Sequence, residues 1–165
     1  MPLFQPNLFQ TGASYVVGTS NFRTQITTGL VTILDAFVTA NPTLLRRTSR
    51  VRPPSIVGDL PIAYVDGRSE TISHDSGIRV RTMTPAVVVV SPLADNVETV
   101  IRHDTLVDLL VDHFSTYPQI INNTIWDQMT VDDEPFDVVS GDDTVRQFFA
   151  TRFRFGNVSI QEGRV

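Results

Sequence analysis

The chain has 165 residues, 41% of them hydrophobic, and a formal net charge of −5. The length is enough for one globular domain with a sizeable core. The hydrophobic content is not typical of a disordered protein. The absence of cysteine excludes disulfides, cysteine-ligated zinc and thiol nucleophiles. The negative net charge argues against a protein that coats nucleic acid. No apolar run approaches the roughly 18 residues of a membrane helix, and the first ten residues lack the basic flank and apolar core of a signal peptide.

All 13 basic residues are arginines, and several alternate with apolar residues. Arg79 and Arg81 flank Val80, and Arg152 and Arg154 flank Phe153. Alternation with period two places such arginines on one face of a sheet, and the planar guanidinium suits fixed pairing with carboxylates. The pattern predicts a half-buried sheet whose polar face meets an acidic surface, such as a second copy of the chain. Codon usage in a GC-rich genome is an alternative cause of the missing lysines, but it does not explain the alternation.

The first half of the chain predicts an arm, a helix and several strands. Residues 1–18 read as an extended arm that folds onto its own domain or docks on a neighbouring subunit. Residues 19–160 are expected to form a single α/β domain, with a short tail at 161–165. The clearest helix covers 20–41 and ends before Pro42. Its apolar residues recur at spacings of three and four: Phe22, Ile26, Leu30, Ile33, Leu34 and Phe37.

A basic segment follows this helix and leads into four predicted strands. The densest basic cluster is Arg46, Arg47, Arg50 and Arg52, ahead of Pro53 and Pro54, which disfavour regular structure. The predicted strands are 61–66, 68–74, 77–83 and 85–90. Asp66-Gly67 predicts a hairpin turn between the first two. The β-branched run PAVVVV at 85–90 is typical of a strand that is buried on both faces.

The second half is harder to assign. Residues 97–114 are compatible with a helix or a strand, and the like charges four apart, together with the β-branched residues, favour a strand over 105–114. Pro118 suits the first turn of a helix near 118–130, with Trp126 facing the core. An acidic loop is then expected over 132–143, including Asp132, Asp133 and Glu134.

The last predicted strand covers 144–155 and has two unlike faces. One face carries Phe149, Thr151, Phe153 and Phe155, and the other carries Arg146, Phe148, Arg152 and Arg154.

The sequence offers few candidates for chemistry. It contains no glycine-rich phosphate loop, no G-x-S-x-G elbow and no H-E-x-x-H motif. His103-Asp104 resembles the metal-binding pair of certain phosphohydrolases, Asp112-His113 could act as a general-base pair, and the 132–143 carboxylates could hold calcium. A solvated histidine at a strand end and a solvated acidic loop or partner surface are the preferred interpretations. We therefore predict no catalytic, cofactor-binding or metal-binding residues, no enzymatic activity and no cofactor.

Five segments in this order resemble the tail terminator proteins of long-tailed bacteriophages, especially those with non-contractile tails. They are TTGLVTILDAFVTANP (27–42), TPAVVVVSP (84–92), TLVDLLVDHF (105–114), QIINNTIWDQM (119–129) and VRQFFATRFRF (145–155). The resemblance covers most of residues 20–160. The arm and the 46–54 segment are not clearly part of the family pattern.

The resemblance implies an α/β (α+β) fold, a mostly antiparallel sheet with two main helices packed on it. It implies a virion protein of the tail or neck that is assembled in the host cytoplasm as a hexameric ring. Such a ring caps the tail tube, stops its polymerisation and presents a surface to the head-tail connector or head-completion protein. DNA passes through the lumen without specific binding, and no membrane is involved.

The residues that we predict at the subunit interface are charged. The basic cluster Arg46, Arg47, Arg50 and Arg52 is expected to face the acidic residues Asp132, Asp133 and Glu134 of the next subunit, and Arg152 and Arg154 are further candidates. Two solvated loops are the interpretation that the sequence alone favours over this pairing. The rival functions are another head-completion or neck protein and a small metal-dependent hydrolase that uses His103-Asp104 or His113.

Overall fold

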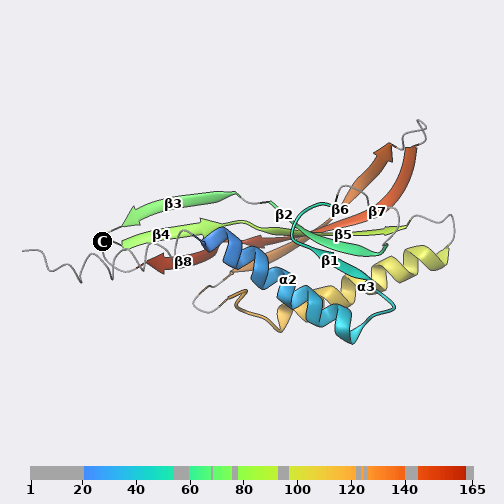
Figure 1. Ribbon diagram of the computed structural model, residues 1–165, viewed down its shortest axis with the longest axis horizontal. Coiled ribbons are helices and arrows are strands. Elements are labelled where there is room, and N and C mark those ends of the chain that lie inside the picture. The colour runs from blue at the N-terminus through green and yellow to red at the C-terminus, as the bar shows by residue number, and fades with distance from the viewer. Residues whose placement is uncertain are drawn as a thin grey trace, which may run out of the picture.

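The computed structural model describes residues 21–53, 60–67, 69–75, 78–92, 97–121, 124, 126–139 and 145–162. The predicted arm at 1–18 lies outside these residues. The described part contains two helices and eight strands (Figure 1). In chain order they are α2 (Phe22–Ala40), β1 (Arg47–Ser49), β2 (Ile62–Asp66), β3 (Glu70–Asp75), β4 (Ile78–Met83), β5 (Ala86–Pro92), α3 (Val97–Ser115), β6 (Gln128–Val139), β7 (Val145–Gly156) and β8 (Val158–Glu162).

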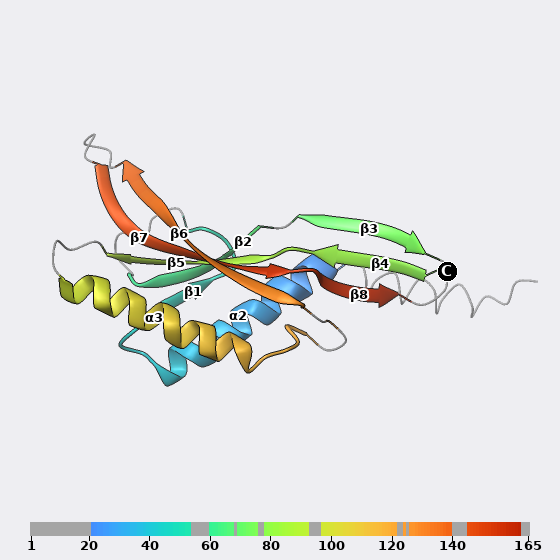
Figure 2. The same cartoon turned by 180° about the vertical axis from the view of Figure 1, so that it is seen from behind.

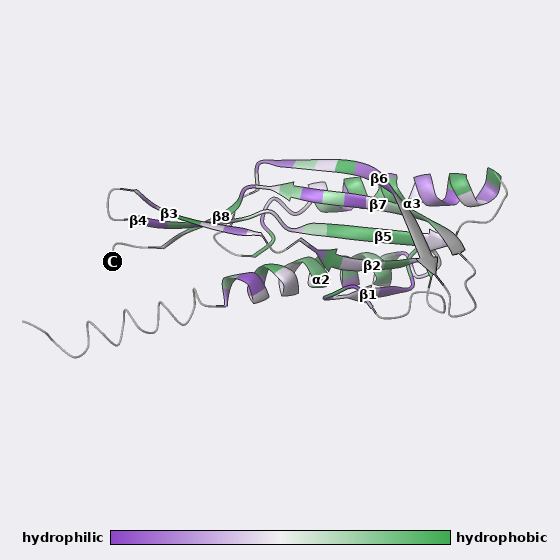
Figure 3. Ribbon diagram, turned by 90° about the horizontal axis from the view of Figure 1, so that it is seen from above, coloured by the Kyte–Doolittle hydropathy of each residue, from purple (hydrophilic) through white to green (hydrophobic). Residues whose placement is uncertain are grey.

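A five-stranded sheet forms the centre of the molecule, with strand order β1-β2-β5-β7-β6 (Figure 3). Strands β1 and β2 are parallel, and the other neighbours are antiparallel. The central strand β5 is buried from Ala86 to Ser91, as its β-branched run predicts. The two edges of the sheet are therefore β1 and β6.

Both helices cover one face of this sheet and enclose the main core (Figure 2). The six apolar residues predicted for the first helix are all buried, because their spacing places them on one side of the helix. They pack with Val87, Val89, Phe153 and Phe155 of the sheet and with Phe114 of α3. The expected α/β (α+β) fold, a mostly antiparallel sheet with two helices packed on it, is confirmed.

A second sheet, ordered β3-β4-β8, projects from one end of the central sheet (Figure 1). We call these three strands the extension. Gly67 has the positive φ expected at a turn, 71°, but β2 and β3 belong to different sheets, so the predicted hairpin between them is wrong. The chain instead crosses here from the central sheet to the extension. Residues 161 and 162, assigned to a tail from the sequence, belong to β8.

The predicted strand over 105–114 is wrong, because this segment lies within helix α3. Its buried residues are His103, Leu106, Leu110 and Phe114, at spacings of three and four. The three aspartates four residues apart, Asp104, Asp108 and Asp112, lie on the exposed side. Water screens their mutual repulsion there, and burial of the opposite side outweighs it.

The predicted helix near 118–130 is also wrong. The described residues between α3 and β6 form turns and irregular structure, and β6 begins at Gln128. Trp126 still packs against the core, with its Nε1–H donated to the carbonyl oxygen of Tyr117 at 2.9 Å. Pro118 is exposed and follows the helix instead of starting one.

The residues predicted as an acidic loop form most of a strand. Asp132, Asp133 and Glu134 belong to β6 and pair with Arg152, Thr151 and Ala150 of β7. Residues 140–144, with Asp142 and Asp143, lie outside the described residues. The prediction failed because the partners of these carboxylates lie about twenty residues further along the chain.

Candidate subunit interface

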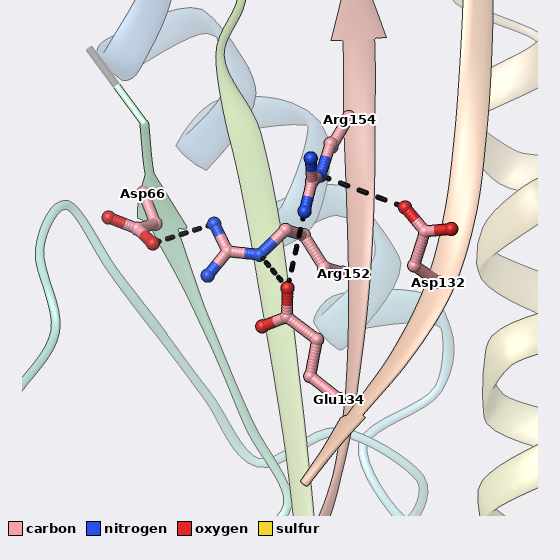
Figure 4. A network of polar contacts seen from close by, with 5 residues as sticks. All are labelled: Asp66, Asp132, Glu134, Arg152 and Arg154. Carbon is pink, nitrogen blue, oxygen red and sulfur yellow. Dashed lines mark hydrogen bonds and ion pairs between the residues drawn. The ribbon is translucent and has the colours of Figure 1, made fainter. Parts of the chain in front are cut away.

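Five charged side chains form a network on the face of the central sheet that the helices leave uncovered, here called the outer face (Figure 4). They come from three strands: Asp66 of β2, Asp132 and Glu134 of β6, and Arg152 and Arg154 of β7. The period of two along β7 places both arginines on this face, as predicted. The network brings together four of the predicted interface residues and adds Asp66, which was predicted only as the end of a strand and part of a turn.

Arg152 is the centre of this network. Its Nε donates to Glu134 Oε1 at 2.6 Å, and its Nη1 donates to Asp66 Oδ2 at 2.8 Å. Asp66 lies two strands away, paired with Ala86 of the intervening β5, and Arg152 reaches it diagonally across that strand. Arg154 is more loosely held, at 3.4 Å from Glu134 and 3.7 Å from Asp132.

The network shifts the pKa values of Arg152 and Asp66. The hydrogen bond to Glu134 is the main cause that raises the pKa of Arg152. Burial acts to raise the pKa of Asp66, but hydrogen bonds from Arg152 and from the Gly67 N–H, with the nearby charges of Arg152 and Arg52, hold it below its usual range. Three carboxylates face two guanidinium groups here, so the network has one surplus negative charge.

A small apolar cluster lies beside the network on the same face. It consists of buried Ile62, Tyr64, Val88, Val90 and Ala150, with Leu60 and Phe148 packed against it. Burial is the main cause that raises the pKa of the Tyr64 hydroxyl. This face is therefore both charged and apolar, a combination that is common at protein interfaces.

The predicted basic cluster lies at the β1 edge of the sheet. Arg46, Arg47, Arg50 and Arg52 are all exposed, and Arg47 is the first residue of β1. The charge of Arg52 contributes to the lowered pKa of Asp66 and partly opposes the rise that burial causes in the pKa of Tyr64. Part of the basic cluster therefore already acts on the network of its own chain, whereas the prediction placed its acidic partners only on the next subunit.

Of the alternating arginines of the extension, Arg81 pairs with a carboxylate of its own chain. Arg79 and Arg81 do share a face, but Arg81 is buried and points toward the start of α2. Its guanidinium lies 5.2 Å from the centre of the Phe22 ring and donates to Glu70, which also accepts from Arg23 of α2 at 2.6 Å. Burial acts to raise the pKa of Glu70, but these two arginines hold it below its usual value. The pairing holds the extension to the helix layer.

His103 is buried in a chain of hydrogen bonds between α3 and the sheet. Its Nδ1 lies 2.9 Å from Ser91 Oγ, and its Nε2 lies 2.8 Å from Thr151 Oγ1. The Thr151 hydroxyl donates to Asp133 Oδ1 at 2.7 Å, because a carboxylate can only accept. Thr151 therefore accepts from His103 Nε2–H, and Ser91 donates to Nδ1. Burial is the main cause that lowers the pKa of His103, against the smaller opposing charges of Asp133 and Asp104.

The histidine-based chemistry considered from the sequence gains no support from this geometry. His103 is buried, whereas its neighbour Asp104 is exposed. His113 lies on a helix instead of at a strand end, and its Nε2–H donates to the Ile33 carbonyl oxygen at 2.8 Å. Among the described residues, no group of three or more histidine, aspartate or glutamate side chains is placed to hold a metal ion.

Comparison with protein-family models finds no match to this chain, and comparison with curated protein sequences finds no relative. Of the helices in the described part of the chain, neither is both long and apolar enough to cross a membrane.

Proposed function

We propose that this chain is a structural virion protein, a phage tail terminator that assembles as a hexameric ring. In this role it caps the tail tube, stops tube polymerisation and provides the surface to which the head-tail connector or head-completion protein attaches. The proposal rests on the resemblance of five segments to that family and on the distribution of charge over the central sheet.

The observation that carries the proposal is the difference between the two edges of the central sheet. The basic cluster of Arg46, Arg47, Arg50 and Arg52 lies at the β1 edge, and Asp132, Asp133 and Glu134 lie at the opposite β6 edge. A closed ring is built from heterologous contacts, in which one surface of a subunit meets a different surface of the next. Opposite charges on opposite edges favour this head-to-tail contact and disfavour contacts between two like edges.

The charge balance also suits a ring through which DNA passes. The net charge is −5, and Arg152 and Arg154 are paired with carboxylates of their own chain. Arginines that are paired in this way contribute little to binding phosphates. We expect duplex DNA to bind weakly or not at all at physiological salt, which a filter-binding titration would measure.

The proposal is tested by mixing the purified protein with polymerising tail-tube protein. Negative-stain microscopy should show six-membered rings at tube ends, and tube growth should stop at substoichiometric amounts of the protein. A protein that stays monomeric at high concentration and leaves tube growth unchanged would contradict the proposal. Binding to DNA-filled heads in place of tubes would instead indicate a neck or head-completion protein.

A further inference from the structure

Rows of side chains run straight across the central sheet and end on β1 and β6. The register pairs each residue of β1 with β2, then β5, β7 and β6 in turn. Two rows lie on the outer face and one lies on the face toward the helices. They are Arg47-Ile62-Val90-Ala150-Glu134, Ser49-Tyr64-Val88-Arg152-Asp132, and Thr48-Ala63-Val89-Thr151-Asp133.

The two edge strands run in opposite directions. Strand β1 is parallel to β2, and three antiparallel pairings separate β2 from β6. An odd number of reversals makes β1 and β6 antiparallel to each other. If a second copy continued the sheet in the same orientation, its β1 would therefore form an antiparallel pair with β6 of the first copy.

We propose that β1 of one copy pairs with β6 of the next, with Arg47 opposite Glu134, Thr48 opposite Asp133 and Ser49 opposite Asp132. This contact rests on the proposed ring assembly and names the surfaces that form it. The pairing joins two sheets through main-chain hydrogen bonds, and side chains opposite each other on one face supply the specificity.

The chemistry of the side chains selects this register. It places Arg47 beside the Glu134 carboxylate, which supplies the charge complementarity of the contact. The hydroxyls of Thr48 and Ser49 already donate within their own chain, to Asp35 and to the Val51 carbonyl oxygen, and would have to exchange these bonds to donate to Asp133 and Asp132. A shift by one residue would put each side chain on the wrong face. A shift by two would bring Ser49 opposite Thr130 in one direction, or Arg47 opposite Phe136 in the other. Only the proposed register places all three residues of β1 opposite acidic residues.

The edge strands are accessible to such a contact. Arg47, Asp132 and Asp133 are exposed, and Glu134 is half-buried in its own network. Unpaired sheet edges invite unwanted pairing, and charged side chains restrict the partners that an edge accepts. Three consecutive carboxylates disfavour pairing of one β6 with another β6. The same carboxylates attract the basic β1 edge.

The contact is tested by disulfide trapping, which the chain permits because it has no native cysteine. Ser49→Cys and Asp132→Cys, combined in one chain, should place two Cβ atoms about 4.5–5.5 Å apart across the boundary, close to the span of a disulfide. Mild oxidation of the assembled protein should then give a ladder of covalent multimers on non-reducing gels. In the control, Ser49→Cys is combined with Val131→Cys, which lies on the other face, and little cross-linking is expected.

A charge reversal gives a second measurement. Arg47→Glu would face Glu134 and should weaken association by roughly tenfold or more. Arg50→Glu is the matched control, because Arg50 belongs to the same basic cluster but lies outside β1, and its effect should be several times smaller. Glu134→Gln added to Arg47→Glu should recover part of the loss by removing the like charge.

The cross-linking and assembly results distinguish a failure of the β1–β6 contact from a failure of the proposed tail-terminator function. Rings that form normally but give no more cross-linking than the Val131→Cys control would overturn the contact and leave the proposed function standing. A wild-type protein that remains monomeric in solution and on tail tubes would overturn both. Assembly of the reduced cysteine variants, followed by light scattering, shows that the substitutions themselves leave folding intact.

Discussion

The two faces of the central sheet differ in the kind of side chains they carry and in how far these are buried. The face toward the helices is mostly apolar, with fully buried Phe153 and Phe155 packed on α2 and α3, and its buried hydroxyls of Ser91 and Thr151 are hydrogen-bonded to His103. The outer face has only a small apolar cluster beside a partly exposed network of ion pairs. Apolar burial supplies most of the stability of a domain, whereas partly exposed charges contribute more to the choice of partner. The helix face is thus expected to determine folding, and the outer face with its edges to determine assembly.

The largest effect is expected from truncation of the helix face. Phe153→Ala should lower the free energy of unfolding by about 3–5 kcal/mol, because it leaves a cavity among buried aromatic rings. Phe148→Ala, on the half-buried outer cluster, should cost roughly 1–2 kcal/mol. Urea denaturation of both variants checks the comparison. Equal losses would show that the two faces contribute alike.

Loss of the His103 hydrogen bonds should have the next largest effect. His103→Leu leaves the hydroxyls of Ser91 and Thr151 without their buried partner, which costs about 1–3 kcal/mol. A double variant with Ser91→Ala should lose less than the sum of the two single variants, since one unsatisfied group is removed. Additive losses in denaturation experiments would contradict the hydrogen-bonded chain.

The same histidine predicts a pH dependence of stability. Its folded pKa is lowered by burial, so the unfolded state takes up a proton first as pH falls below about 6.5. The contribution of His103 is complete above that pH and declines toward its lower folded pKa. Melting temperatures recorded from pH 7.5 to 5 should therefore fall more in the wild type than in His103→Leu. Parallel profiles would be evidence against a buried neutral imidazole.

Smaller effects are expected on the outer face. Arg152→Ala removes two short hydrogen bonds to carboxylates and should cost about 1 kcal/mol, because water screens these partly exposed groups. Arg154→Ala, which breaks two longer and exposed contacts, should cost about 0–1 kcal/mol. Thermal unfolding at low salt and at about 1 M salt should show that added salt removes the Arg154 effect first. A larger loss at Arg154 than at Arg152 would reverse the assignment of the network centre.

The sequence was most informative where burial depends on a local pattern. The apolar spacing of α2, the β-branched run of β5 and the two faces of β7 were all predicted correctly. In each case the alternation or spacing of side chains reports directly which side meets the core.

The failures share a different cause. The prediction for α3 rested on the repulsion between aspartates and on the β-branched residues, and it had no means of showing that His103 is buried through its bonds to Ser91 and Thr151. The β6 prediction treated carboxylates as solvated, although Glu134 pairs with Arg152 on the next strand. Asp66 gave no signal of its own, because its role depends on an arginine 86 residues away. Polar residues whose partners are distant in the chain cannot be placed by local pattern.

The junction between the central sheet and the extension has a mechanical consequence. Two adjacent strands pass through it: β4 continues into β5 through Thr84 and Pro85, and β7 continues into β8 through Asn157, whose φ is 52°. The Phe155 N–H donates to the Pro85 carbonyl oxygen at 2.9 Å, so the two segments are hydrogen-bonded to each other at the junction between the sheets. A force applied to the tip of the extension is therefore transmitted along two continuous backbones to the aromatic core. We therefore expect the extension to move together with the central sheet and not independently of it.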